Sequence, residues 1–195
     1  VVYCIRPAEN EHFNDAYSLI LNSLYGNNKS YVIPYKTDIL IIEIADAISD
    51  EVKSNAKMIK DMINSEIYTD VFIGISDAHK GIMNIKESLS EALEAIEVGM
   101  KFNLPDNIYI SKDMLIEKVV SLIPEDKAKE LAGQVFKTGI DEIMDSEMLK
   151  TMEVFFKNNL NISDSSKILY IHRNTLLYRL DKIQKATGLD IRKFE

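Results

Sequence analysis

Hydrophobic positions in residues 1–110 follow two different periods. Short apolar, β-branched runs predict strands, and they fall at 1–6, 31–35, 39–45, 71–75 and 108–110. Between these runs, apolar residues recur at helical spacing and predict helices at 10–25, 49–67 and 82–102. The order β-α-β-β-α-β-α-β is that of a ferredoxin-like or nucleotide-cyclase-like sandwich. We therefore predict an α+β domain with a mainly antiparallel sheet and helices on one face of it.

After residue 111 the pattern is helical. Apolar spacing predicts helices at 114–123, 125–137, 147–158 and 163–169, then a longer helix from Arg173 to about Ala186. A tight connection at Tyr170, Ile171 and His172 joins the last two. A short helix, a tight turn and a second helix with a basic outer face are the elements of a helix-turn-helix DNA reader. We expect three parts: an α+β domain at 1–111, a helical linker at 112–145 and an all-α helix-turn-helix domain at 146–195.

The last predicted helix has two chemically different faces. At about 100° per residue, leucine and isoleucine side chains gather on one side, which we expect to pack on the preceding helices. The opposite side carries Asn174, Thr175, Tyr178, Arg179, Lys182 and Lys185. Arginine suits guanine and asparagine suits adenine in the major groove, whereas lysine suits phosphate. Ser163 begins the short helix, where its hydroxyl and free amides could hold a phosphate.

Charge is distributed unevenly along the chain. Of the formal net charge of −8, residues 163–195 contribute seven basic and four acidic side chains, or +3, which leaves −11 for residues 1–162. This asymmetry is typical of a protein that approaches a polyanion with one end. Ordinary solvated lysines on a helical hairpin would give the same count, so the charge alone leaves both interpretations open.

Composition indicates a folded, cytoplasmic protein without a membrane partner. The chain has 46% hydrophobic and 28% charged residues, which are globular values. No apolar run reaches the length of about 18 to 20 residues that crosses a bilayer. Cys4 stands alone in an apolar strand, and we expect it to be a buried structural thiol.

The sequence carries no pattern for catalysis or for a cofactor. A metal for phosphoryl chemistry needs carboxylates, typically at a strand end, but the first strand ends in Arg6 and the hairpin at 35–38 has no glycine and one acid. P-loop, GxGxxG, HExxH and zinc-binding spacings are missing from the sequence. We interpret three acids near the hairpin as surface residues: Asp38, Glu43 and Asp46. We expect no enzymatic activity.

The C-terminal sequence resembles a known family. The runs LNIS at 160–163 and IHRNTLLYRL at 171–180, with TGL at 187–189, closely resemble the C-terminal helix-turn-helix of PucR/CdaR-type regulators of purine and sugar-diacid catabolism. That DNA-binding unit is similar to the one in the Fis protein. The resemblance implies that residues 1 to about 110 are a degenerate GGDEF-like domain. It also implies groove contacts by His172, Arg173, Asn174, Thr175, Tyr178 and Arg179, and a phosphate contact by Ser163.

Together these features predict a sequence-specific DNA-binding transcriptional regulator. Its expected partners are double-stranded DNA, a second copy of the chain, and a small-molecule effector. A homodimer is expected because one small helix-turn-helix makes too few contacts for specific binding. The chain starts within a strand and without methionine, so we expect a fragment that lacks an N-terminal effector-sensing domain. The alternative is a regulatory nucleotide- or small-ligand-binding or dimerisation module with an inactive cyclase-like domain.

Overall fold

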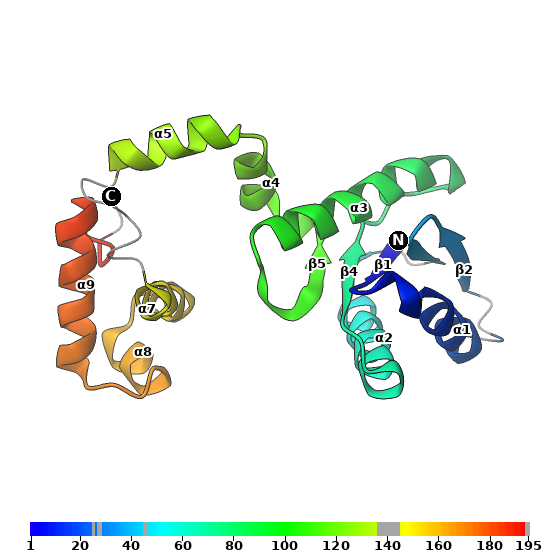
Figure 1. The fold of residues 1–195 in the computed structure, drawn as a ribbon, viewed down its shortest axis with the longest axis horizontal. Helices are drawn as coiled ribbons and strands as arrows, with labels where there is room; N and C mark the ends of the chain where they lie inside the picture. The colour runs from blue at the N-terminus through cyan, green and yellow to red at the C-terminus, as the bar shows by residue number, and fades with distance from the viewer. Residues whose placement is uncertain (25, 27–28, 45–46, 136–144, 194–195) are drawn as a thin grey trace. The chain divides into compact units, whose positions relative to one another are not determined.

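The computed structural model describes residues 1–24, 26, 29–44, 47–135 and 145–193. Two compact units divide the chain, Val1–Leu122 and Ile123–Glu195 (Figure 1). The first unit combines a five-stranded sheet with helices, and the described part of the second is helical. The segment expected to be a linker is shared between the units, because α4 (Leu115–Ser121) lies in the first and α5 (Glu125–Val135) in the second.

All five predicted strands are present in one mixed sheet. They are β1 (Val2–Pro7), β2 (Ser30–Tyr35), β3 (Asp38–Glu43), β4 (Val71–Ile75) and β5 (Ile108–Ile110). Their order in the sheet is β2-β3-β1-β4-β5, and among the strand pairs of the described residues only β4–β5 is parallel. The predicted hairpin is confirmed, since Tyr35 pairs with Asp38 across a two-residue turn in which Lys36 has a φ of 54°.

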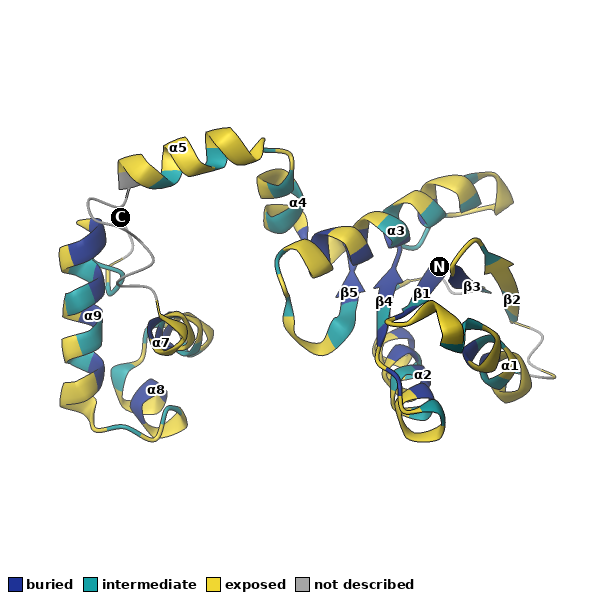
Figure 2. Ribbon diagram, viewed as in Figure 1, coloured by how far each residue is buried: buried dark blue, intermediate teal, exposed yellow. Residues whose placement is uncertain are grey.

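Helices cover both faces of the sheet, so the prediction of one covered face was wrong. On one face, α1 (Phe13–Ser23) and α2 (Asp50–Ile67) pack against Tyr3 and Ile5 of β1. On the other, α3 (Ile85–Lys101) packs against Cys4. Figure 2 shows the buried residues on the strands and on the helix sides that meet them. Because side chains alternate along a strand, the continuous apolar run of β1 makes both of its faces hydrophobic and requires a layer on each.

Asp38 is buried, so its interpretation as a surface acid was wrong. Only 3% of the residue is exposed. Its carboxylate accepts two hydrogen bonds from Arg6, at 2.8 Å from Nε and 3.0 Å from the terminal nitrogen. The bidentate pair satisfies the buried charge and raises the pKa of Arg6. Glu43 is half-buried and accepts a hydrogen bond from the Tyr3 hydroxyl at 2.7 Å, whereas Asp46 lies outside the described residues.

Cys4 is a buried thiol, as predicted. It is fully buried in the β1 strand, and burial raises the pKa of the thiol above its ordinary value. The neutral thiol therefore acts as a small hydrophobic side chain between β1 and α3. No reactive role is needed to explain its position.

Three helices of the second unit form a small core of their own. They are α7 (Ser146–Lys157), α8 (Ile162–Ile168) and α9 (Arg173–Thr187). Phe155 of α7 packs with Leu176 and Leu180 of α9, and these three side chains are at most 1% exposed. Partly buried hydrophobic residues surround them: Leu160, Ile162, Leu169, Ile171 and Ile191. This core fixes the three helices against one another and thereby positions α9.

Candidate nucleic-acid interface

The helix-turn-helix is defined by local caps. Asn161 precedes α8, and its side-chain oxygen accepts hydrogen bonds from the amides of Ser163 at 2.9 Å and Asp164 at 3.1 Å. The turn after α8 is closed by Tyr170, which has a left-handed φ of 55°, and by a hydrogen bond from the Ile171 amide to the Ser166 carbonyl at 3.0 Å. This bond pattern is a Schellman motif, which ends the helix sharply. The turn is therefore specified by the chain itself.

The predicted recognition helix begins at the predicted residue. His172 caps α9, because its Nδ1 accepts the Asn174 amide at 3.2 Å. The helix runs to Thr187, one residue past the predicted end, and Gly188 closes it with a φ of 78°. Glycine is suited to this left-handed position because it has no Cβ. The capping imidazole remains on the exposed surface at the helix start.

The hydrophobic side of α9 packs as expected. Leu176, Leu180 and Ile183 are at most 1% exposed, while Leu177 is half-buried. Ser165 and Ser166 of α8 are also buried. Their small side chains let α8 and α9 approach closely. In Figure 2 the buried residues of α9 follow one side of the helix.

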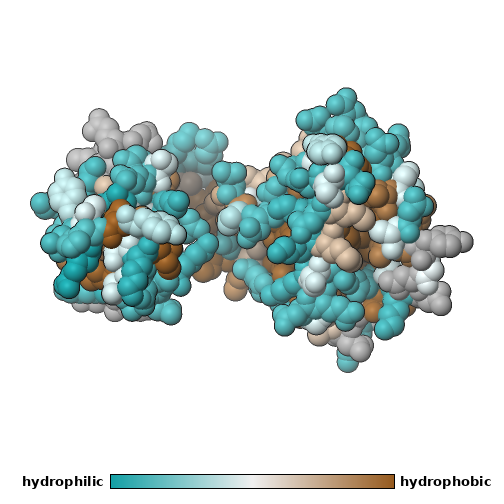
Figure 3. Space-filling view, turned by 90° about the horizontal axis from the view of Figure 1, so that it is seen from below, coloured by the Kyte–Doolittle hydropathy of each residue, from teal (hydrophilic) through white to brown (hydrophobic). Residues whose placement is uncertain are grey.

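Most of the predicted DNA-contacting residues at the start of α9 and along it have exposed side chains. His172, Arg173, Asn174, Thr175, Tyr178 and Lys185 are exposed, and Lys182 is half-buried. Among the described residues, no ion-pair partner lies within reach of Arg173, Lys182 or Lys185. This surface, which we call the α9 polar face, therefore holds amide, hydroxyl, phenol, imidazole and free cationic groups. Figure 3 shows that hydrophilic residues cover much of the visible surface of this unit.

Arg179 differs from the other predicted contacts. Only 11% of its side chain is exposed. One terminal nitrogen donates a hydrogen bond to the Thr151 hydroxyl at 3.0 Å, and the other pairs with the Glu147 carboxylate. The guanidinium thus lies against α7 instead of on the α9 polar face.

Ser163 is exposed, but the backbone amides beside it are occupied. The amides of Ser163 and Asp164 both donate to Asn161, so the expectation of free amides for a phosphate was wrong. The asparagine before the helix is a favoured cap residue because its oxygen reaches these amides. The serine hydroxyl is the group of this residue that a phosphate could still reach.

The acid beside the α9 polar face is neutralised within the chain. Arg192 pairs with Asp181 at 2.7 Å and with Asp190 at 2.6 Å, and it donates to the Gln184 side chain at 2.6 Å. These contacts lower the pKa of Asp190 and raise the pKa of Arg192. In the charge count from the sequence Arg192 is a free basic residue, but in the structure its contacts hold the C-terminal end of α9. A simple charge count could not reveal this.

Tyr170 is an exposed residue that was not among the predicted DNA contacts. It follows α8 in the turn, and 95% of it is exposed. A bulky residue with a left-handed φ is an outlier, because its Cβ approaches the following carbonyl oxygen. Its position between the two helices was predicted, but its backbone conformation depends on the turn geometry, which residue pattern does not show.

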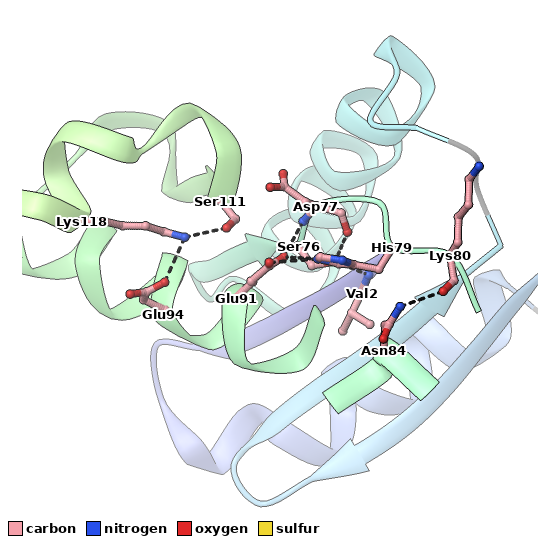
Figure 4. Close-up of polar contacts among 10 residues, drawn as sticks. All are labelled: Val2, Ser76, Asp77, His79, Lys80, Asn84, Glu91, Glu94, Ser111 and Lys118. Atoms are coloured by element: carbon pink, nitrogen blue, oxygen red, sulfur yellow. Dashed lines mark hydrogen bonds and ion pairs between the residues drawn. The ribbon is translucent and has the colours of Figure 1, made fainter. Parts of the chain in front are cut away.

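Two groups of described residues bring three potential metal ligands together, both in the first unit. One is Glu9, Glu11 and His12, and the other is His79, Glu87 and Glu91. In the second group, Glu91 already accepts hydrogen bonds from the Asp77 amide at 3.0 Å and from His79 Nε2 at 2.9 Å (Figure 4). The contacts fasten the loop after β4 to α3 and raise the pKa of His79 through the hydrogen bond to Glu91. A structural role is sufficient to explain them.

Within the part of the chain that the structure describes, no helix combines the length and hydropathy needed to cross a bilayer.

Part of the second unit matches a known protein family. Residues 148–195 match the family described as the PucR C-terminal helix-turn-helix domain. The match covers most of α7 and all of α8 and α9. The matched residues therefore include those that form the Phe155 core.

Longer similarities extend over most of the chain. The proline-responsive transcriptional activator PutR of Bacillus subtilis is 29% identical in an alignment 179 residues long that covers 85% of this chain and 42% of that protein. The purine catabolism regulatory protein of B. subtilis is 24% identical over 160 residues, or 79% of this chain and 30% of that protein. The carbohydrate diacid regulator of Escherichia coli is 29% identical over 126 residues, or 63% of this chain and 32% of that protein.

The chain spans less than half of the length of each of these three relatives. The similarity to PutR includes the α+β unit as well as the helical one, since an alignment that covers 85% of the chain cannot be confined to either unit. Residues 148–195 thus match the PucR C-terminal helix-turn-helix domain, and longer parts of the chain are similar to a purine catabolism regulatory protein over 79% of its length and to a carbohydrate diacid regulator over 63%.

Proposed function

We propose that this chain is part of a transcriptional regulator that binds duplex DNA sequence-specifically through α9. The observation that carries the proposal is the α9 polar face, where His172, Arg173, Asn174 and Thr175 are exposed at the start of the helix. In helix-turn-helix proteins the N-terminal residues of the second helix contact base edges in the major groove. The similarity of residues 148–195 to the PucR helix-turn-helix supports the same orientation.

The roles of individual residues follow from their chemistry. Arg173 is suited to guanine and Asn174 to adenine, because each can form two hydrogen bonds to the base edge. Thr175 and Tyr178 can donate and accept through their hydroxyls. Lys182, Lys185 and the Ser163 hydroxyl are suited to phosphate oxygens. These assignments leave His172 two roles, as the cap of α9 and as a polar group at the groove.

A second copy of the chain and an effector complete the proposal. One helix-turn-helix unit contacts a short stretch of DNA, and a two-fold dimer would place two recognition helices about one helical turn apart on half-sites. The relatives include a proline-responsive activator, which supports control by a small molecule. The effector would bind outside this chain, in the portion of the protein that the relatives have in addition.

We propose that the first unit is a catalytically inactive, cyclase-like domain. The elements β1 to β4 with α1 and α2 follow the β-α-β-β-α-β order of a ferredoxin-like fold, and α3 with β5 extends it. The hairpin acid Asp38 is occupied by Arg6, so it is not free to hold a metal. A dimerisation or small-ligand-binding role for this unit is the second candidate, favoured by the apolar side chains that α4 exposes, among them Leu115, Ile116 and Val119.

The test is fluorescence anisotropy with a duplex that the wild-type chain selects from a random-sequence library. Arg173→Ala should cost about 1–3 kcal/mol of binding free energy and relax the preference at one base pair. Lys182→Ala should weaken binding to all sequences alike and reduce the slope of log affinity against log salt by about one. Lys86→Ala, which removes an exposed lysine of α3, is the matched charge control. Unchanged binding by both α9 variants would reject the assignment.

A further inference from the structure

Arg179 lies in the middle of α9, yet its side chain belongs to the contact between α9 and α7. Both terminal guanidinium nitrogens are used, one by the Thr151 hydroxyl at 3.0 Å and one by the Glu147 carboxylate. The side chain is 11% exposed, whereas Tyr178 beside it in sequence is 69% exposed. Arginine is suited to such a contact because its planar fork of donors fixes the direction of each hydrogen bond.

The partners on α7 are themselves held in place. Thr151 is fully buried, and its hydroxyl donates to the Glu147 carbonyl at 2.8 Å, so its lone pairs are directed to Arg179. Glu147 stands in the first turn of α7, after the Asp145 cap. A carboxylate in this position is favoured by the helix dipole. The contact is therefore a connected network instead of an isolated surface ion pair.

The network supplies a directional contact that the hydrophobic core lacks. Leu176 and Leu180 pack on Phe155 through apolar contacts, which are non-directional and tolerate small rotations of a helix. Arg179 is four residues after Thr175, so the two stand one helical turn apart. A rotation of α9 that breaks the Arg179 contacts would also turn Thr175 and the rest of the α9 polar face.

We infer that Arg179 is a positioning residue that fixes the rotation of the recognition helix on α7, and that it does so without touching DNA. The inference rests on the proposed DNA-binding function of α9. It replaces the role that the sequence pattern gave to Arg179, that of a groove contact. Of the cations on α9, the ones left for nucleic acid are then Arg173, Lys182 and Lys185 within the described residues.

A substitution of Glu147 distinguishes the two roles of Arg179, because they predict opposite changes in the affinity for DNA. If Arg179 left Glu147 to bind a phosphate, Glu147 would compete with DNA, and Glu147→Gln would raise the affinity. If Arg179 positions α9 through Glu147, the same substitution lowers the affinity. Glu147→Gln is a mild change, since its side chain is 62% exposed and glutamine keeps the shape. It therefore tests the idea even if Arg179→Ala unfolds the helix-turn-helix.

The experiment measures anisotropy of the selected duplex over a range of salt concentrations with the full 195-residue chain. Glu147→Gln should weaken binding a few-fold and Arg179→Ala about tenfold or more, the usual size for loss of a charged hydrogen bond. The salt slope should stay at the wild-type value in both, because no phosphate contact is removed. The double variant should bind about as weakly as Arg179→Ala alone, since the two residues act as one unit.

Glu153→Gln is the matched control. Glu153 is another exposed acid of α7, paired with Lys157 at 2.7 Å, and its substitution removes the same charge without touching α9. It should raise the affinity slightly or leave it unchanged. Tighter binding by Glu147→Gln than by Glu153→Gln, or a salt slope for Arg179→Ala that is lower by about one, would overturn the inference. Failure of the wild-type chain to bind any selected duplex would instead overturn the proposed function.

Discussion

The two units use arginines in opposite ways. In the first unit, Arg6 of β1 donates two hydrogen bonds to the buried Asp38 carboxylate. In the second, Arg173 opens α9 with its side chain exposed and with no ion-pair partner among the described residues. A guanidinium that a buried acid already neutralises is closed to an anionic ligand, whereas an unpaired one at the surface remains available. Arg179 resembles Arg6 in this respect, although it lies on the same helix as Arg173.

The substitution Gly74→Val should destabilise the protein most, and it tests whether the two units unfold independently. Gly74 of β4 faces α3, and a Cβ there would lie 1.9 Å from the Ala92 carbonyl oxygen. Gly74→Val must therefore displace backbone, and we expect it to lower the free energy of unfolding of the first unit by about 4 kcal/mol or more. Calorimetry with amide hydrogen exchange would show whether protection is lost in residues 1–122 and kept in α7 to α9.

Gly133→Ala in α5 is the control, since a Cβ at this position meets no atom within 4 Å. Alanine should stabilise the helix by about 0.5–1 kcal/mol. Loss of protection in both units upon Gly74→Val would mean that they fold as one body, and the contrast between Arg6 and Arg173 could not be assigned to separate units.

The buried pair of Arg6 and Asp38 should contribute strongly to stability. Asp38→Ala leaves the Arg6 charge without its partner and should lower the free energy of unfolding by about 3 kcal/mol. The double variant Arg6→Met/Asp38→Leu removes both charges and should recover most of that loss. Arg173→Ala, by contrast, should change stability by no more than about 0.5 kcal/mol. Urea denaturation followed by circular dichroism measures all three.

A loss of stability in Arg173→Ala as large as that in Asp38→Ala would show that the Arg173 side chain also supports the fold. Arg179→Ala should give an intermediate loss of stability, because Arg179 has partners on α7 but its acid is largely exposed.

A smaller effect is expected at the turn between α8 and α9. Tyr170→Gly removes the Cβ at a φ of 55°, and the folded state should gain about 1 kcal/mol from the relief of strain, less what glycine adds to the entropy of the unfolded chain. A higher melting temperature of the helix-turn-helix is the expected result. Tyr170→Ala keeps the Cβ and should give no such gain, which makes it the control for loss of the ring.

The smallest effect concerns pH. The hydrogen bond to Glu91 raises the pKa of His79 in the folded state. The stability that this contact contributes is then fully present below the unfolded pKa of about 6.5 and is lost as pH rises through the higher folded pKa. The pair is partly exposed, so the contribution should stay under about 1 kcal/mol. Melting temperatures of the wild type and His79→Gln should differ most near pH 6 and converge at alkaline pH.

Much of the fold could be predicted from residue pattern because the elements are locally specified. The strands, the hairpin between β2 and β3 and the start of α9 at Arg173 all follow from apolar periodicity and capping residues. The second covered face of the sheet was missed, although the continuous apolar run of β1 carried the signal. Pairing of Arg6 with Asp38 could not be predicted, because the two residues are 32 positions apart in the chain.

The candidate interface likewise has features that local sequence predicts and features that depend on long-range contacts. The amphipathic pattern of α9 and its first residue could be predicted from the sequence, since these depend on a helical period and on a cap within a few residues. Which cations are free depends on the packing of the helices. Arg179 and Arg192 look like Arg173 in the sequence, but each meets acids brought to it by packing, Glu147 from α7 and Asp181 and Asp190 around the end of α9. Helical periodicity orders residues around one axis, whereas ion pairing depends on what the fold places beside it.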